Sequence, residues 1–398
     1  MSFEEMREFL KEKLRDEELR IALERSRKSY LAKRRRYLEK YSYIKELAKE
    51  VRSIKERAVS KLDELVRQAM DSLEENKVQV HLARTADMAR EIVGDIVGSH
   101  KLVVKAKSIT TDEIGLRSFL QERGNEVWET DLGELIVQWL GSKPMHFITP
   151  AINVRRERVA ELIREKIGAE VDPDDIPEMT KVVRRFLREK FIRADFGVTG
   201  ANVLSADTGS LFLITNEGNG RLVTALPEVH IAVVGVEKIV PTLEDAFKVC
   251  DVIMKYAGYG AVAYLSAITG PSKTGDIEKT IVYGAHGPRE VHVILLDNGR
   301  MKASRDPVLR EALYCLRCGS CQYLCPVFDL VGGYWGGDAY VGGIGVLWNA
   351  ITGRMDEAMI QSFFCLGCGK CKEVCPMNIK TPEAIREIRA RWMREKLE

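Results

Sequence analysis

Two four-cysteine runs near the C-terminal end constrain this chain more than any other feature. The first run holds Cys315, Cys318, Cys321 and Cys325, and the second holds Cys365, Cys368, Cys371 and Cys375. In both runs the cysteines are separated by two, two and three residues, and a proline follows the fourth. The chain has nine cysteines, an odd number, so a disulfide framework explains the pattern poorly. Metal ligation explains it better.

Both runs have the spacing of the bacterial ferredoxin run, whose fourth cysteine ligates the other cluster in two-cluster proteins. We therefore predict two neighbouring [4Fe-4S] clusters. The predicted ligands are Cys315, Cys318, Cys321 and Cys375 for the first cluster, and Cys365, Cys368, Cys371 and Cys325 for the second. Zinc is the competing metal, because it also binds paired cysteines. Two adjacent clusters form a path for electrons, so electron transfer is favoured over a purely structural role.

The segment before the cysteines alternates between strand-like and helix-like periods, which favours an α/β fold with a parallel sheet. Strands are expected at residues 78–82, 102–105, 126–129, 230–234, 263–268 and 291–296, with a hairpin at 202–204 and 211–215. Helices are expected at residues 86–97, 112–123, 133–140, 154–167, 177–191 and 243–254. The pattern divides the chain into a helical N-terminal segment (1–75), an α/β domain (76–300) and an α-helical domain with the cysteines (301–398).

Composition excludes several classes of protein. Hydrophobic residues make up 45% and charged residues 30% of the chain, which are values of a globular protein. The longest apolar runs, such as 291–296, are far shorter than the roughly 18 residues that span a membrane. No signal peptide is recognisable, so we expect a cytoplasmic protein. The basic run 33–36 lacks a nucleic-acid-binding motif and is interpreted as a solvated helix face.

Two segments of the α/β domain could bind an anion. The stretch Thr-Asn-Glu-Gly-Asn-Gly-Arg at 215–221 follows an expected strand and offers backbone amides, a carboxylate and a guanidinium. Two lysines lie where another strand ends, the edge at which α/β folds bind ligands. The candidate ligand-binding residues are Lys105, Lys107, Asn216, Glu217, Gly218, Asn219, Gly220 and Arg221. An ordinary tight turn and solvated lysines are the alternatives.

The remaining reactive side chains give weaker signals. His230 and His292 lie in apolar strands, where a hydrogen-bonded structural histidine is the favoured interpretation. His286 lies in an expected loop and is a better acid–base candidate. Cys250, outside both runs, is expected to pack in the core. The chain has no dinucleotide fingerprint and no ATP-binding P-loop.

The sequence resembles the lactate utilisation protein B family. The resemblance rests on residues 104–108, 129–134, 208–241 and 296–300 together with both cysteine runs, and extends over roughly 75–380. It implies a LUD domain, similar in fold to the CoA-transferase and ribose-5-phosphate isomerase group, joined to an α-helical two-cluster ferredoxin domain. It also implies two partners, a cysteine-rich CCG-domain subunit and a LUD-only subunit.

We therefore expect an electron-transfer subunit of a soluble complex that oxidises L-lactate, or a related 2-hydroxy acid, to pyruvate or the corresponding 2-oxo acid. A small carboxylate would then be the ligand of the α/β domain. The alternative is an electron relay in a heterodisulfide-reductase-like complex, with the LUD domain as a docking scaffold. A CoA-type or sugar-phosphate site is a third hypothesis. Whether catalysis occurs on this chain stays open, because the sequence contains no flavin motif.

Overall fold

A six-stranded parallel sheet forms the centre of the α/β region. We describe a computed structural model of residues 1–397, in which the strand order is β1-β12-β7-β4-β2-β3 and every neighbouring pair is parallel. The strands are β1 (Gln79–Ala83), β2 (Leu102–Lys105), β3 (Glu126–Glu129), β4 (Phe196–Thr199), β7 (Val229–Gly235) and β12 (Glu290–Leu296). The parallel sheet predicted from the alternating pattern is therefore confirmed.

Helices cover both faces of this sheet, which explains why its central strands are apolar along their whole length. Successive side chains of a strand point to opposite faces. Ile231 and Val233 pack in one cluster with α5 and α7, whereas Ala232 and Val234 pack with α4. The helices of this region are α5 (Ala86–Val97), α6 (Ile109–Glu113), α7 (Leu116–Glu122), α8 (Leu132–Leu140), α9 (Arg156–Ile167), α10 (Ile176–Arg193), α11 (Asn219–Ala225), the 3-10 turn η1 (Val236–Lys238) and α12 (Leu243–Tyr256).

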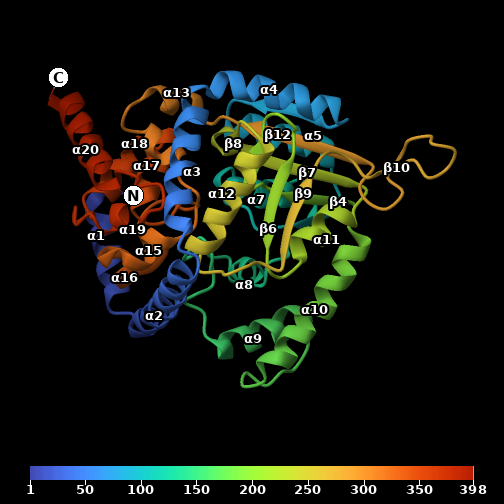
Figure 1. Ribbon diagram of the computed structural model, residues 1–398. Coiled ribbons are helices and arrows are strands. Elements are labelled where there is room, and N and C mark those ends of the chain that lie inside the picture. Colours follow the sequence, from blue (N-terminus) through green and yellow to red (C-terminus); the bar gives the residue numbers. More distant parts are fainter. Residues whose placement is uncertain (398) are drawn as a thin grey trace.

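A second, smaller sheet lies beside the first and has the order β8-β5-β6-β9. Its strands are β5 (Val203–Ser205), β6 (Leu211–Thr215), β8 (Ile239–Val240) and β9 (Tyr264–Ile268). β5 and β6 pair antiparallel, as the predicted hairpin requires. The short hairpin of β10 (Lys273–Thr274) and β11 (Val282–Tyr283) belongs to a loop that projects from the molecule at the right of Figure 1.

Four helices precede the sheets: α1 (Phe3–Leu14), α2 (Glu17–Lys40), α3 (Ile44–Ser60) and α4 (Leu62–Glu75). The helical segment expected at 1–75 is thus interrupted three times. One new helix, α2, begins where the Asp16 side chain accepts a hydrogen bond from the Leu19 amide. α3 packs on α12, and α2 packs on α15 and α16 of the C-terminal region. The N-terminal helices therefore join the two other regions (Figure 1).

The C-terminal region is entirely helical and shares one hydrophobic core with α1, α2, α3 and α12. Its elements are α13 (Arg300–Arg305), α14 (Arg310–Leu313), α15 (Ser320–Leu324), α16 (Pro326–Val331), η2 (Gly332–Tyr334), α17 (Gly343–Ile351), α18 (Met355–Ser362), α19 (Lys370–Val374) and α20 (Thr381–Leu397). Among the described helices, none is long and apolar enough to cross a membrane.

Two further differences from the sequence analysis each involve a glycine. The helix expected at 112–123 is two short helices, α6 and α7, because Gly115 between them adopts a left-handed φ of 62°. Strand β4 was not expected, since Gly197 weakens its strand pattern. That glycine is needed, because a Cβ there would lie 1.9 Å from the Val223 carbonyl oxygen of α11.

Candidate functional site

The two cysteine runs occupy two similar turn–helix segments, which pack against each other through α15 and α19. We name residues 315–319 the first loop and residues 365–369 the second loop. Each loop ends in a glycine with left-handed φ, 74° at Gly319 and 79° at Gly369, and a five-residue helix follows. The repeated sequence spacing therefore becomes a repeated backbone geometry.

The fourth cysteine of each run lies beside the other run. The thiol of Cys375 is electrostatically close to Cys315 and Cys318, whereas that of Cys325 is close to Cys365 and Cys368. These are the two groupings that the ferredoxin spacing predicts, although the ligand assignment itself stays a prediction. Within residues 1–397 no three acidic, histidine or cysteine side chains converge tightly enough to hold a single metal ion.

The thiols have the chemistry that a cluster needs. Burial raises the pKa of Cys315 to about 11 and that of Cys371 to about 12, and coordination to iron would supply the positive charge that deprotonates them. A backbone amide already points at a sulfur in each loop, because Arg317 N donates to Cys315 Sγ and Gly367 N donates to Cys365 Sγ, both at 3.4 Å. Such amide–sulfur contacts are one way in which a protein tunes cluster potential. The residues present thus fit two iron–sulfur clusters.

A cavity of about 270 Å³ lies between the α/β region and the first loop. On the α/β side it is lined by segments that follow β2, β3 and β4, together with the end of β6 and the turn after it. This is the carboxyl edge of the parallel sheet, where α/β folds bind ligands. On the other side it is lined by Leu316, Arg317 and Cys318. A predicted cluster ligand therefore forms part of the wall of a ligand-sized cavity.

Five charged residues line this cavity: Lys107, Lys238, Arg317, Asp131 and Glu217. Burial and the neighbouring Asp131 carboxylate raise the pKa of Glu217 to about 7. Burial and the nearby Arg317 guanidinium hold the pKa of Lys238 well below its usual value, and its Nζ donates to the Ala201 carbonyl oxygen at 2.6 Å. Three basic side chains thus face two carboxylates, one of which is easily protonated.

Most of the predicted anion-binding residues reach the cavity. Those that line it are Lys107, Asn216, Glu217, Asn219 and Gly220. Gly218 and Arg221 do not line it, and the Arg221 guanidinium lies over the Tyr264 ring at 4.5 Å. Lys105 does not line it either, because its side chain is 1% exposed and its Nζ lies 2.9 Å from Glu129 and 3.1 Å from Asp112. This lysine forms a closed ion pair inside the fold.

The histidines and the ninth cysteine lie outside the cavity. His230 is buried and its Nε2 lies 2.8 Å from Thr199 Oγ1, as expected of a structural histidine. His292 is buried as well, and His286 is exposed in the loop after β11. Cys250 is fully buried in the core, as predicted. None of these four side chains is placed to act on a ligand in the cavity.

Comparison with known proteins agrees with this arrangement. Residues 66–296 match the family model of the LUD domain. The chain belongs to the LUD domain family. Residues 311–379 match the 4Fe-4S dicluster domain, which indicates two [4Fe-4S] clusters. The cavity therefore lies between the LUD domain and the dicluster domain.

The curated relatives are named for electron transport and lactate use. The chain is 33% identical over 347 residues to "Uncharacterized electron transport protein YkgF" of Escherichia coli (strain K12), covering 86% of this chain and 71% of that protein. It is 37% identical over 316 residues to "Lactate utilization protein B" of Bacillus thuringiensis (strain Al Hakam), covering 79% of this chain and 64% of that protein. The chain thus spans less than two thirds of the length of the Bacillus relative. It is an iron–sulfur electron transport protein related to lactate utilization protein B.

A solved structure, a DUF162 family protein from Deinococcus radiodurans, aligns with 59% of this chain and 98% of its own at 17% identity and a TM-score of 0.34. That similarity is too weak to support an inference.

Lys238, Tyr259 and Arg317 are among the cavity residues that the sequence analysis did not name as candidates. Lys238 lies in η1 and Tyr259 in the segment after α12, and no local pattern marks either of them as a ligand contact. A signal for Arg317 was present, however. Aligning the two runs places this arginine, in Cys-Leu-Arg-Cys-Gly, opposite the glycine of Cys-Leu-Gly-Cys-Gly.

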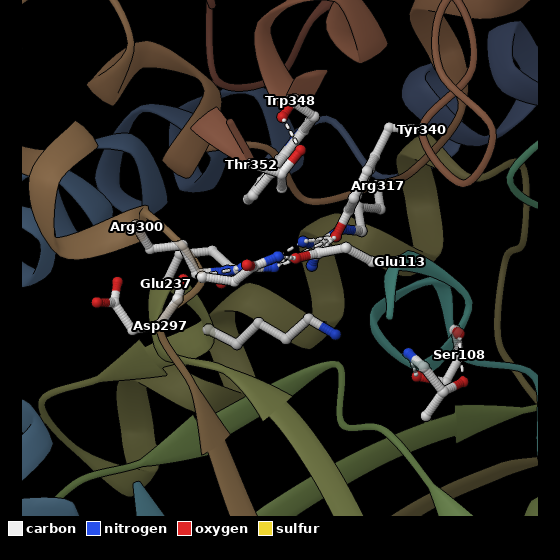
Figure 2. A network of polar contacts seen from close by, with 12 residues as sticks. Ser108, Glu113, Glu237, Asp297, Arg300, Arg317, Tyr340, Trp348 and Thr352 are labelled. Carbon is white, nitrogen blue, oxygen red and sulfur yellow. Dashed lines mark hydrogen bonds and ion pairs between the residues drawn. The ribbon is translucent and has the colours of Figure 1, made fainter. Parts of the chain in front are cut away.

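A buried ion-pair network lies behind the first loop and connects the two domains (Figure 2). Arg300 Nη1 donates to Glu113 at 2.9 Å, and its Nε donates to Glu237. Glu237 also accepts from Arg317 Nη2, which donates in addition to Tyr340 Oη at 2.9 Å. The Arg300, Glu113 and Glu237 side chains are at most 1% exposed. The network therefore holds the first loop against the LUD domain at a fixed position.

His146 also supports the first loop, through Gly319. The Ile148 amide donates to its Nδ1 at 3.0 Å, so Nε2 carries the proton and donates to the Gly319 carbonyl oxygen at 3.3 Å. Burial lowers the pKa of His146 to about 3, which keeps the ring neutral. A Cβ at position 319 would lie 2.6 Å from this ring, so Gly319 is required by the close approach as well as by its φ.

Proposed function

We propose that this chain is the electron-transfer subunit of a complex that oxidises L-lactate, or a related 2-hydroxy acid, to the 2-oxo acid. The observation that carries the proposal is the shared cavity. Asn216 and Glu217 of the LUD domain line one side, and Cys318, a predicted ligand of the first cluster, lines the other. A molecule bound there would lie next to an electron acceptor without any intervening protein domain.

The size and charge of the cavity favour a small carboxylate. Its volume of about 270 Å³ is at the lower limit of the roughly 300–1,000 Å³ of pockets for drug-sized ligands. It suits an acid of three or four carbons and is small for a CoA thioester. Lys107, Lys238 and Arg317 line the cavity together with Asp131 and Glu217, and Glu217 loses its negative charge when it is protonated. The cavity can therefore attract a monoanion.

Oxidation of a 2-hydroxy acid to a 2-oxo acid releases two electrons and two protons, so one electron would go to each cluster, one proton to Glu217 and the other proton to solvent. One-electron acceptance is the chemistry that each bound [4Fe-4S] cluster would supply. Glu217 is the residue best suited to take a proton, because a pKa of about 7 leaves much of it ionised at neutral pH and still basic enough to accept one. Asp131 beside it keeps that pKa raised.

The second loop is the expected point of electron delivery. Cys321 is electrostatically close to Cys371, so the two predicted cluster sites are neighbours. Cys368 is exposed, and Leu366 beside it is 70% exposed. We propose that a partner accepts electrons there, and the family resemblance suggests the cysteine-rich CCG-domain subunit, with a LUD-only subunit in the same complex. We place this complex in the cytoplasm.

The test is an anaerobic purification of the protein with whatever co-purifies, followed by iron and sulfide analysis and addition of L-lactate. We expect about eight irons per chain and lactate-driven bleaching of the cluster absorbance, with a matching EPR signal. D-lactate and buffer are the controls. A fully loaded sample that does not respond to lactate, alone or with its partners, would instead support the relay hypothesis, with the LUD domain as a docking scaffold.

A further inference from the structure

One residue distinguishes the two cluster loops, which otherwise share their backbone geometry. Position 317 in the first loop and position 367 in the second both have left-handed φ, 55° and 68°. Both backbone amides donate to the sulfur two residues earlier at 3.4 Å. The second loop has glycine there, the residue that adopts this φ without strain. The first loop has an arginine.

An arginine with left-handed φ needs an explanation. The left-handed region is sterically unfavourable for a residue with a Cβ, because the Cβ crowds the neighbouring carbonyl oxygen, whereas glycine adopts it freely. Such residues concentrate at functional sites, where the surrounding structure maintains them. Gly367 adopts the same backbone geometry in the second loop without a side chain. The Arg317 side chain is therefore not needed to form the loop, and we look for its role in its contacts.

The contacts of Arg317 leave part of its guanidinium available. Nη2 donates to Glu237 and to Tyr340 Oη, as Figure 2 shows. Nη1 makes no hydrogen bond to any residue that the structure describes, and Nε is buried without a partner. The side chain is only 9% exposed, and the residue lines the cavity. The guanidinium is therefore nearly desolvated, only partly paired and next to a ligand-sized space.

The charges around Arg317 also favour a bound anion. Two carboxylates, Glu113 and Glu237, already neutralise two guanidinium groups, those of Arg300 and Arg317. The Lys238 amine lines the same cavity, and its Nζ donates to the Ala201 carbonyl oxygen at 2.6 Å. An anion in the cavity would add a further acceptor for the Arg317 guanidinium, which is only partly paired.

We propose that Arg317 binds the carboxylate of the cavity ligand and thereby couples ligand binding to the first cluster site. The chemical class of the ligand, a small carboxylate, rests on the proposed function. Ligand binding and the first cluster site would be coupled through Arg317, because one residue contacts both. Its side chain would bind the anion, while its backbone N–H donates to Cys315 Sγ, and Cys318 is the next residue. A cluster's properties depend on hydrogen bonds and charge near its sulfurs.

The test uses iron-loaded protein and oxamate, a redox-inert small carboxylate, in anaerobic calorimetric titrations. Arg317→Gly is the principal variant, because glycine relieves the backbone strain and leaves the loop free to bind iron. Arg317→Lys keeps the charge without the planar fork, and Arg317→Gln provides a second neutral side chain if glycine impairs loading. Arg305→Gln is the control, since that arginine is 73% exposed, pairs with Asp63 and does not line the cavity.

We expect Arg317→Gly and Arg317→Gln to weaken oxamate binding roughly tenfold or more, the cost of a lost charge-assisted hydrogen bond. Arg317→Lys should fall between, and Arg305→Gln should bind as the natural protein does. Oxamate should also perturb the EPR signal of the reduced natural protein but not that of Arg317→Gly. Inorganic phosphate in a parallel titration distinguishes a carboxylate site from a general phosphate site.

Unchanged oxamate affinity in both neutral variants would overturn the role of Arg317 while leaving the proposed function intact. Arginine-dependent binding of phosphate without binding of oxamate would overturn the carboxylate class. Arginine-dependent oxamate binding, combined with no lactate-driven bleaching, would support this inference and refute lactate oxidation. The two proposals can therefore fail separately.

Discussion

The two cluster loops share a sequence spacing, a glycine-terminated turn and an amide–sulfur contact, yet they differ in how far the surrounding structure buries and supports them. Cys318 in the first loop is buried beside the cavity, whereas Cys368 in the second loop is exposed. An ion-pair network and His146 support the first loop, while the atoms around Gly367 leave a Cβ free of contacts. Two loops with the same spacing of cysteines can therefore serve different surroundings, with the first loop lining a cavity and the second loop facing solvent.

The largest expected effect comes from the fourth cysteines, which test whether each run completes the other cluster. Cys375→Ser should remove the cluster held by the first loop, and Cys325→Ser the one held by the second, because each serine removes a thiolate from the opposite set. Iron analysis should fall from about eight to about four irons per chain in either variant. Mössbauer or EPR spectra should show a different remaining cluster in each. Identical spectra from the two variants would contradict the crossed assignment.

The next largest effect is a loss of stability when the ion-pair network is broken, because this network supports the first loop and not the second. Arg300→Gln should lower the free energy of unfolding by about 3–5 kcal/mol, because it leaves Glu113 and Glu237 buried without their main cation. Denaturant unfolding of iron-loaded protein measures this. Arg305→Gln, which breaks an exposed pair with Asp63, should cost no more than about 1 kcal/mol. Equal losses would show that the network is not what stabilises the junction.

Ligand binding at the first loop should depend on pH through Glu217. Its raised pKa of about 7 means that lowering the pH from 8 to 6 protonates it and removes a negative charge from the cavity. The groups facing it are Asp131, Lys107 and Tyr259. Oxamate affinity should therefore rise as pH falls, by at most about tenfold per unit for one coupled proton.

Glu217→Gln supplies the control for that pH series, because the amide keeps the shape of the side chain and cannot titrate. The variant should bind oxamate with a much flatter pH profile. An affinity that rises with pH in the natural protein would contradict the assignment of Glu217 as the titrating group.

A smaller effect is expected from exchanging the residue that distinguishes the loops. Gly367→Arg should cost about 1–2 kcal/mol of unfolding free energy, the price of a left-handed φ for a residue with a Cβ. Gly367→Asn should cost less, because asparagine tolerates that region better. A stability of Gly367→Arg equal to the natural protein would remove the strain argument made for Arg317.

The smallest expected effect is at Arg221, which the LUD turn pattern predicted as a ligand contact. Its guanidinium lies over Tyr264 and outside the cavity lining, so Arg221→Gln should change oxamate affinity by less than about twofold. Calorimetry under the conditions used for Arg317 measures this. A large loss would show that the ligand reaches beyond the cavity.

Local patterns predicted the backbone well and the side-chain partners poorly. The bounds of β2 and β3 were predicted correctly, because their apolar residues form short uninterrupted runs. The division of the chain at residues 75 and 300 stays a prediction. Lys105 was expected to meet a ligand, but its neighbour across the parallel pair is Glu129, 24 residues away, and one sequence does not reveal such a pairing.

The same limit explains why the junction between the domains was missed. Arg317 and Glu237 are 80 residues apart and meet only because the dicluster domain packs on the LUD domain. The cysteine spacing, by contrast, depends on the cluster geometry and can be recognised within a short stretch of sequence. Motifs therefore predicted which cofactors to expect, while the position of the cavity against the first loop required the fold.

If electrons enter through the first loop, lactate should reduce only the single-cluster variant that keeps the cluster beside the cavity. Each variant would be purified anaerobically with its partners, and its absorbance and EPR signal followed after L-lactate is added. We expect that Cys325→Ser, which keeps that cluster, is reduced by lactate, whereas Cys375→Ser is not. Reduction of Cys375→Ser alone, or of neither variant when the natural complex is also inert, would contradict it.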